Sequence, residues 1–185
     1  MANYTLTAKS ALGGYPLDQK GLKIREISHF KIFSLGVFKG CDQEFAKVLD
    51  EKFDVAAPKP GRANVKGDLS ILSIARDQWF LRLPDQDGYG AKDAARDFAK
   101  TAAVTDQSDS WVSLELSGRN IVDKLERLCP IDIDKSLFPV NAVARTSMAH
   151  LGVIITRMCD TPEGHSCFLL LSPSSSAKSF LHALN

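Results

Sequence analysis

The sequence predicts an α+β fold of short antiparallel sheets with helices packed on one side. Short apolar stretches with strand-like composition alternate along the chain with stretches whose apolar residues recur at helical spacing. A tight connection separates residues 69–75 from residues 78–84, which is typical of a β-hairpin. Paired strands with helices between the pairs favour antiparallel sheets covered by a layer of helices.

Residues 1–20 are expected to form an extended N-terminal arm, because the segment 10–21 has three glycines, a proline and few large apolar residues. Asp42 is a candidate cap for a helix whose apolar residues Phe45, Val48 and Phe53 recur at helical spacing. Two prolines and two glycines then break regular structure. The elements predicted in this half are a strand at 30–38, a helix within 41–53, and strands at 69–75 and 78–84.

The second half continues the alternation of strands and helices. Ser117 is a candidate cap for a helix that Pro130 would end. Residues 142–158 are rich in strand-forming residues and fit either two strands or one long bent strand. The other predicted elements are a helix at 91–103, strands at 103–108 and 111–117, a strand at 166–172 and a closing helix at 174–184.

Residues 21–185 are expected to form one folded region, whose length allows two small subdomains at about 21–108 and 109–185. A strand, a turn and a helix follow each other both near 79–103 and near 167–184. This likeness is compatible with a diverged internal duplication, but it is too weak to establish a repeat.

The balance of charge and the apolar runs exclude some classes of protein. The formal net charge is +1 and no run of lysine or arginine occurs, which argues against nucleic acid as the main partner. The longest apolar runs are far shorter than the roughly 20 residues that a membrane helix needs. The first ten residues lack the apolar core of a signal peptide. We therefore expect a cytoplasmic protein with reduced cysteines and no membrane partner.

Several sites of common chemistries are missing from the sequence. No glycine-rich phosphate loop and no serine-hydrolase elbow is present. Cys159, His165 and Cys167 surround one predicted turn, but a closed zinc site needs a fourth ligand. Buried cysteines beside a turn histidine are the favoured interpretation. His29 and His150 lie in or beside strands, where a lone histidine is more often structural than a general base.

The segment LCPIDIDKSLFPV, residues 128–140, raises a choice between chemistry and structure. Asp132 and Asp134 would point the same way in an extended segment, so paired acid–base work is conceivable. Apolar residues alternate with them, however, and an aspartate in a turn commonly accepts backbone hydrogen bonds. The structural interpretation is favoured. Trp79 and Trp111, on predicted strands, are expected in the core or at a partner interface.

In the second half of the chain, Leu116, Ser117 and Gly118 lead from a predicted strand into a helix that ends with Cys129 and Pro130. With this pattern, the second half resembles the gamma subunit of heterotetrameric sarcosine oxidase. The resemblance covers most of the chain and is strongest over residues 111–158. It departs from the family pattern at Ala75 and Arg76, where glycine and proline are usual, and at Ala11, where proline is common. The matching positions are Leu116, Ser117, Gly118, Leu125, Cys129, Pro130, Asp132, Phe138, Pro139, Arg145 and Thr146, with Trp79 in an upstream hairpin.

The resemblance implies a non-catalytic subunit that packs against the large alpha subunit, in a complex with beta and delta subunits. That complex oxidatively demethylates sarcosine to glycine and passes the one-carbon unit to tetrahydrofolate. Its FAD, FMN, NAD and zinc sites are assigned to the other subunits, so no cofactor, metal or catalytic residue is expected here. The implied fold is part of the aminomethyltransferase (glycine-cleavage T-protein) fold. Residues expected to serve the interface or the structure are Trp79, Pro130, Asp132, Phe138, Arg145 and Thr146.

Two other functions compete with this interpretation. A stand-alone folate-binding protein of the aminomethyltransferase-like class would need an acidic residue for the pterin ring, and Asp132 or Glu115 would serve. A small enzyme that uses Asp132 and His150 is less favoured, since neither a nucleophile nor a metal set accompanies them.

Overall fold

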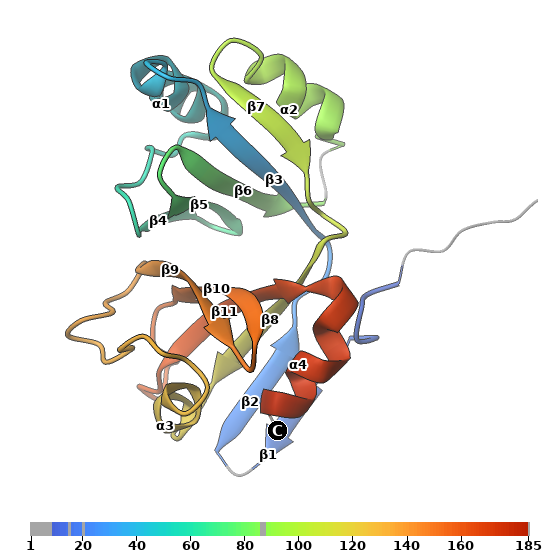
Figure 1. Cartoon of the computed structure of the whole chain (residues 1–185), viewed down its shortest axis with the longest axis vertical. Coiled ribbons are helices and arrows are strands. Elements are labelled where there is room, and N and C mark those ends of the chain that lie inside the picture. Colours follow the sequence, from blue (N-terminus) through green and yellow to red (C-terminus); the bar gives the residue numbers. More distant parts are fainter. Residues whose placement is uncertain (1–8, 15, 20, 86–87, 185) are drawn as a thin grey trace, which may run out of the picture.

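The computed structural model describes residues 9–14, 16–19, 21–85 and 88–184 (Figure 1). Within these residues the strands form a five-stranded and a six-stranded antiparallel sheet. The five-stranded sheet has the order β4 (Ala63–Lys66), β5 (Leu69–Ala75), β6 (Gln78–Pro84), β3 (Phe30–Val37) and β7 (Ala102–Asp106). The six-stranded sheet has the order β1 (Pro16–Gln19), β2 (Leu22–Glu26), β8 (Trp111–Ser117), β11 (Cys167–Pro173), β10 (Leu151–Arg157) and β9 (Val143–Met148).

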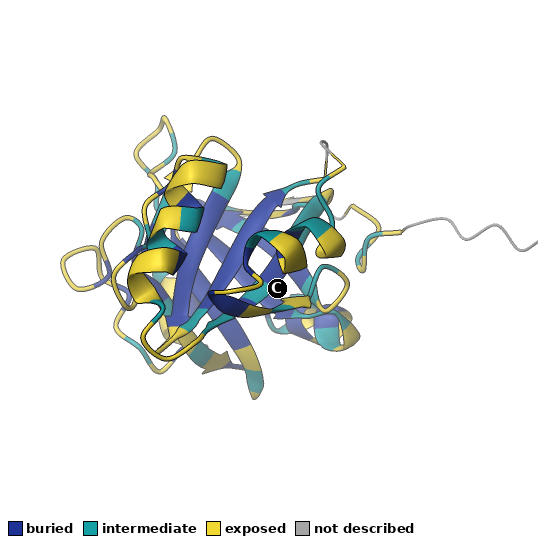
Figure 2. Cartoon of the chain, turned by 90° about the horizontal axis from the view of Figure 1, so that it is seen from above, coloured by how far each residue is buried: buried dark blue, intermediate teal, exposed yellow. Residues whose placement is uncertain are grey.

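The helices cover the outer faces of the two sheets, so the molecule has four layers (Figure 1). Figure 2 shows how the helices expose their outward faces to solvent above buried strands. The α+β architecture with helices on one side of each sheet confirms the sequence prediction. The helices are α1 (Asp42–Phe53) and α2 (Ala91–Asp97) on the five-stranded sheet, and α3 (Ile121–Glu126) and α4 (Ala177–Leu184), after a 3₁₀ turn η1 (Ser174–Ser176), on the six-stranded sheet.

Side chains separate into three apolar clusters because neighbouring strand residues point to opposite faces. On β6, Trp79 and Leu81 pack outward beneath α1 and α2, whereas Phe80 points inward. On the six-stranded sheet, Phe168 packs outward toward α3 and α4, whereas Leu171 points inward. The inward residues of both sheets form the layer between them, which we call the inter-sheet layer: Ile32, Ala63, Leu72, Ile74, Phe80, Val143, Ile154 and Leu171.

The two sheets have matching topologies. The series β3-α1-β4-β5-β6-α2-β7 corresponds to β8-α3-β9-β10-β11-α4, and β2 takes the place beside β8 that β7 takes beside β3. The halves meet where Arg62 and Ala142 form an isolated antiparallel bridge. The Ala63 amide donates to the Asn141 carbonyl at 2.8 Å, and the Val143 amide donates to the Gly61 carbonyl at the same distance, 2.8 Å. This symmetric arrangement gives a topological basis to the likeness between the two halves.

Some local elements differ from the sequence predictions. Within the predicted arm, Pro16–Gln19 forms β1 and pairs with β2, while residues 1–8, 15 and 20 lie outside the described part. Ala63–Lys66 forms β4 inside a stretch that was expected to be irregular. The helix predicted over 91–103 ends at Asp97, because Ala102–Asp106 pairs with β3 instead. This pairing overrides the helix propensity of its alanines.

The predicted cap residues of two helices also differ from those in the structure. Ser117 ends β8, and Asn120 rather than Ser117 occupies the N-cap position of α3. At the first helix, Asp42 is the first helical residue and Cys41 occupies the cap position. The last helix-like bond after α3 runs from the Cys129 amide to the Leu125 carbonyl at 2.9 Å, directly before Pro130. Residues 142–158 form two strands, β9 and β10, joined by a tight turn.

We predict that Gly118→Ala lowers the free energy of unfolding by more than about 2 kcal/mol. Gly118 has a φ of +137°, and an added Cβ would lie 2.0 Å from the carbonyl oxygen of Gly21. The clash involves backbone on both sides, so no side-chain rotation relieves it. Gly152→Ala is the matched control, because its Cβ would meet nothing within 4 Å. Urea unfolding of both variants checks this, and equal stability of the two would contradict it.

Candidate functional site

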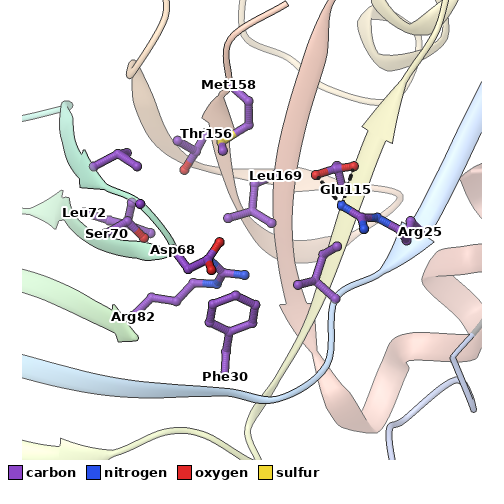
Figure 3. Close-up of a pocket in the computed structure, with 13 residues that line it drawn as sticks. Arg25, Phe30, Asp68, Ser70, Leu72, Arg82, Glu115, Thr156, Met158 and Leu169 are labelled. Carbon is purple, nitrogen blue, oxygen red and sulfur yellow. Dashed lines mark hydrogen bonds and ion pairs between the residues drawn. The ribbon is translucent and has the colours of Figure 1, made fainter. Parts of the chain in front are cut away.

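A cavity of about 130 Å³ opens at one end of the inter-sheet layer (Figure 3). This volume is well above the roughly 10–15 Å³ that one water needs, but below the roughly 300 Å³ typical of sites for drug-sized ligands. Both sheets contribute to its wall, together with the turn between β4 and β5. The polar residues of the wall are Arg25, Asp68, Ser70, Arg82, Glu115 and Thr156.

Arg82 is the most unusual residue of this cavity. It lies on β6 opposite Ile32 and Ser70, so the strand register directs its side chain inward with Leu72 and Phe80. The residue is only 7% exposed. Its guanidinium carbon lies 3.3 Å from the centroid of the Phe30 ring, a stacking contact that suits the flat guanidinium.

The polar atoms of this wall are incompletely paired. Within the described structure, neither Nε of Arg82 nor the buried Oγ of Ser70 has a hydrogen-bond partner. Burial lowers the pKa of Arg82 to about 10, and the negative charges of Asp68 and Glu115 act in the opposite direction. Arg82 therefore remains a cation at neutral pH and is held away from water, and no counterion is bonded to it among the described residues.

An ion pair lies at the mouth of the cavity. Nη2 of Arg25 donates to both carboxylate oxygens of Glu115, at 3.0 and 3.1 Å. Arg25 on β2 and Glu115 on β8 face each other in the register of the six-stranded sheet. Glu115, one candidate for a pterin-binding acid, thus lines the cavity but already has a cationic partner.

The two tryptophans lie in apolar layers. Trp79 is 9% exposed and packs on Phe45 of α1, with ring centroids 5.0 Å apart. Trp111 packs against Phe80 in the inter-sheet layer, with ring centroids 5.5 Å apart. Trp79 is therefore a core residue, whereas Trp111 is half-buried and packs against the inter-sheet layer.

The crossover segment 128–140 is a chain of turns. Oδ1 of Asp132 accepts a hydrogen bond from the Asp134 amide at 2.9 Å, and Oδ1 of Asp134 accepts one from the Ser136 amide at 2.8 Å. The bonds from Ser136 lower the pKa of Asp134. Both aspartates are exposed, and their turn bonds agree with the structural interpretation. Pro130 is exposed as well, whereas Phe138 is buried in the core beneath α3 and α4.

The remaining predicted positions lie on β9, at the edge of the six-stranded sheet. Arg145 is exposed, and Thr146 is half-buried. Oγ1 of Thr146 lies 3.8 Å from the Sγ of Cys129. The six predicted positions therefore do not form one site. Trp79 lies on the five-stranded sheet, beneath α1 and α2. The sequence analysis did not predict Arg82 or Asp68 as site residues.

The cysteine and histidine candidates are dispersed. Cys159 is exposed, while Cys167 is buried on β11. The His165 amide donates to Oγ1 of Thr161 at 3.2 Å, as part of the turn. Among the described residues, no three His, Cys, Asp or Glu side chains gather in a way that would hold a metal.

The histidines outside this turn lie in exposed positions. His29 and His150 are both exposed residues with positive φ, of 66° and 67°. His150 lies in the β9–β10 turn, and within the described residues no hydrogen bond joins it to Asp132. His182 is exposed on α4. The described helices also include none long and apolar enough to cross a membrane.

Comparison with known families is decisive for the class of protein. The model of the sarcosine oxidase, gamma subunit family matches residues 39–171. The chain belongs to this family. A comparison with curated proteins gives no match.

Solved structures show the same fold. A chain of the heterotetrameric sarcosine oxidase from Corynebacterium sp. U-96, in complex with pyrrole 2-carboxylate, matches with a TM-score of 0.77 and 19% identity. The match covers 91% of this chain and 84% of that one. Aminomethyltransferase T of the glycine cleavage system from Bartonella henselae matches with a TM-score of 0.62 and 17% identity. This match covers 89% of this chain but 45% of the transferase chain. The present chain therefore has the fold of about half of the transferase.

We predict that Phe138→Ala lowers the free energy of unfolding by about 3–5 kcal/mol, the usual cost of removing a buried phenylalanine ring. Phe138 is 7% exposed, whereas its neighbour Leu137 is 68% exposed. Leu137→Ala, the matched control, should change stability by less than about 0.5 kcal/mol. Chemical denaturation measures both values, and a small effect of Phe138→Ala would show that the crossover segment is not anchored by this ring.

We predict that a thiol reagent modifies Cys159 first in the folded chain and reaches Cys167 only on unfolding. Cys159 is exposed, while burial raises the pKa of the Cys167 thiol to about 11 and so suppresses the reactive thiolate. Mass spectrometry of the modified peptides over time distinguishes the two. The substitution Cys159→Ser should remove the fastest phase, and rapid labelling of Cys167 would refute the assignment.

Proposed function

We propose that this chain is a non-catalytic gamma subunit that packs against the large alpha subunit of a heterotetrameric sarcosine oxidase. The observation that carries the proposal is the family match over residues 39–171, together with the likeness to a chain of such an enzyme over 91% of this chain. The complex would oxidatively demethylate sarcosine to glycine and transfer the one-carbon unit to tetrahydrofolate.

The side chains of the described region support a subunit without chemistry of its own. The carboxylates of the candidate acids Asp132 and Asp134 accept hydrogen bonds from backbone amides of their own turns. Among the described residues, no hydrogen bond joins the candidate base His150 to Asp132. The family resemblance implies that FAD, FMN, NAD and zinc would be held by the alpha, beta and delta subunits. A cytoplasmic location is part of this proposal.

The crossover segment is our candidate for the contact with the alpha subunit. Leu137 is 68% exposed and Val140 is 39% exposed, although both are apolar. Exposed apolar side chains that flank a buried anchor, here Phe138, are typical of a surface that a partner covers. Pro130 and Asp132 lie exposed on the same segment and fix its backbone.

A folate-binding role remains the alternative, because the fold also matches aminomethyltransferase T. The cavity of about 130 Å³ is small for a whole folate, and its Glu115 is paired with Arg25. Titration of the isolated chain with a reduced folate separates the two functions. Saturable binding there would favour the alternative.

We predict that Leu137→Glu prevents the chain from co-purifying with the large flavin-containing subunit while leaving its own stability within about 0.5 kcal/mol of the original. A charge at the centre of an apolar contact would be desolvated without a partner. The measurement is affinity purification of the tagged chain with its natural partners, followed by flavin absorbance and sarcosine-dependent oxygen uptake.

Ala99→Glu is the matched control, because Ala99 is exposed beside α2 on the opposite outer layer. This variant should co-purify with the yellow partner as the original chain does. Failure of the original chain to bring down any flavoprotein would refute the subunit role. Normal co-purification of Leu137→Glu would refute the crossover segment as the contact.

A further inference from the structure

The two most buried arginines, Arg157 and Arg82, differ in their hydrogen-bond partners, and this difference points to a binding site at Arg82. Arg157 is 2% exposed, and its guanidinium donates to the Cys167 carbonyl at 3.1 Å and to the carboxylate of Asp160. Arg82 is 7% exposed, yet within the described residues it makes neither an ion pair nor a hydrogen bond through its side chain. The charges of Asp68 and Glu115 act favourably on this guanidinium, but neither carboxylate bonds it in the described structure. A buried guanidinium without a bonded acceptor favours the binding of one.

The cavity places other unpaired groups around Arg82 (Figure 3). The buried hydroxyl of Ser70, on the neighbouring strand, also has no hydrogen-bond partner. Thr156 is buried in the opposite wall. Asp68 lies exposed at the rim, and no ion pair or hydrogen bond of its side chain is found in the described structure. The cation inside the cavity and the anion at its edge thus attract each other through space, but in the described structure no hydrogen bond or ion pair joins them.

The charges of the wall select the kind of ligand. The charged residues are Arg25 and Arg82 against Asp68 and Glu115, so the wall is neutral as a whole, and Arg25 and Glu115 already neutralise each other. A simple anion would satisfy Arg82 but would add a negative charge beside Asp68. A ligand that carries both a carboxylate and an ammonium group satisfies both unpaired residues and keeps the balance.

We propose that this cavity binds a small α-amino acid as its zwitterion. The guanidinium of Arg82 and the hydroxyl of Ser70 donate hydrogen bonds to the ligand carboxylate, as a planar guanidinium does best. The ligand ammonium lies toward Asp68. The apolar part of the wall, which includes Phe30, Leu72 and Leu169, leaves room for a hydrogen, a methyl group or a similarly small substituent. The site is independent of the proposed subunit function.

Calorimetric titration of the full chain with glycine tests the proposal, with acetate and methylammonium as single-charge comparators. Glycine should bind saturably, and each comparator should bind at least about tenfold more weakly, because it satisfies one of the two charges. Binding of acetate as tight as that of glycine would overturn the zwitterion in favour of a plain anion site. Absence of saturable binding by glycine would overturn the site itself.

Variants assign the two ends of the ligand. Arg82→Met should weaken glycine binding at least about tenfold, and Arg82→Lys, which keeps the charge but not the planar fork, should weaken it as well. Asp68→Asn should weaken glycine binding and leave acetate binding unchanged or stronger. Arg76→Met is the control, since the Arg76 side chain is 95% exposed in the β5–β6 turn. Unchanged glycine affinity in either Arg82 variant would contradict the assignment.

Discussion

Contact between the inner faces of the two sheets is the interaction on which the rest of this structure depends. Each sheet has one face under helices and one face against the other sheet, so neither half could bury both of its faces alone. Apolar burial of about 25 cal/mol per Å² makes such a shared layer a large part of the stability. The topological match of the halves follows naturally, because two equivalent surfaces can cover each other.

The same layer explains where the unusual chemistry lies. Its middle is filled by apolar residues such as Leu72, Phe80 and Leu171. Toward one end of the layer the inward positions are no longer all apolar. There the inward-facing residue of β6 is Arg82. A polar cavity between the two sheets arises there, and the turn between β4 and β5 adds Asp68 to its wall. The crossover segment 128–140, by contrast, belongs to the outside, where its aspartates hold turns and Leu137 faces solvent.

Local sequence patterns predicted three strands in which apolar residues recur along most of the length. Residues 69–75, 78–84 and 111–117 are strands with the predicted bounds. Other strands depend on partners that are distant in the sequence. β2, which was not predicted, pairs with β8, far along the chain. The strand predicted at 103–108 is found at Ala102–Asp106, where it pairs with β3. The local sequence does not show which distant strand such a segment will pair with.

The site was harder to predict than the fold. Alternation along QWFLRLP places Arg82 on the face opposite Trp79 and Leu81, but it does not say whether that face meets water or another sheet. Motif searches favour recognised combinations of acids, histidines and cysteines, whereas this cavity is defined by groups that lack partners. The family resemblance gave the class of protein correctly, because it rests on the pattern of the whole second half.

Native-state hydrogen exchange of the isolated chain tests most directly whether the inter-sheet layer makes one cooperative unit. The amides of Ala63 and Val143, which donate across the junction of the two halves, are the probes. If the layer makes one cooperative unit, both amides exchange only through global unfolding, and their free energy of exchange equals the free energy of unfolding from denaturant titration. Exchange of either amide at a much lower free energy, while each sheet stays protected, would show that the halves separate and would contradict it.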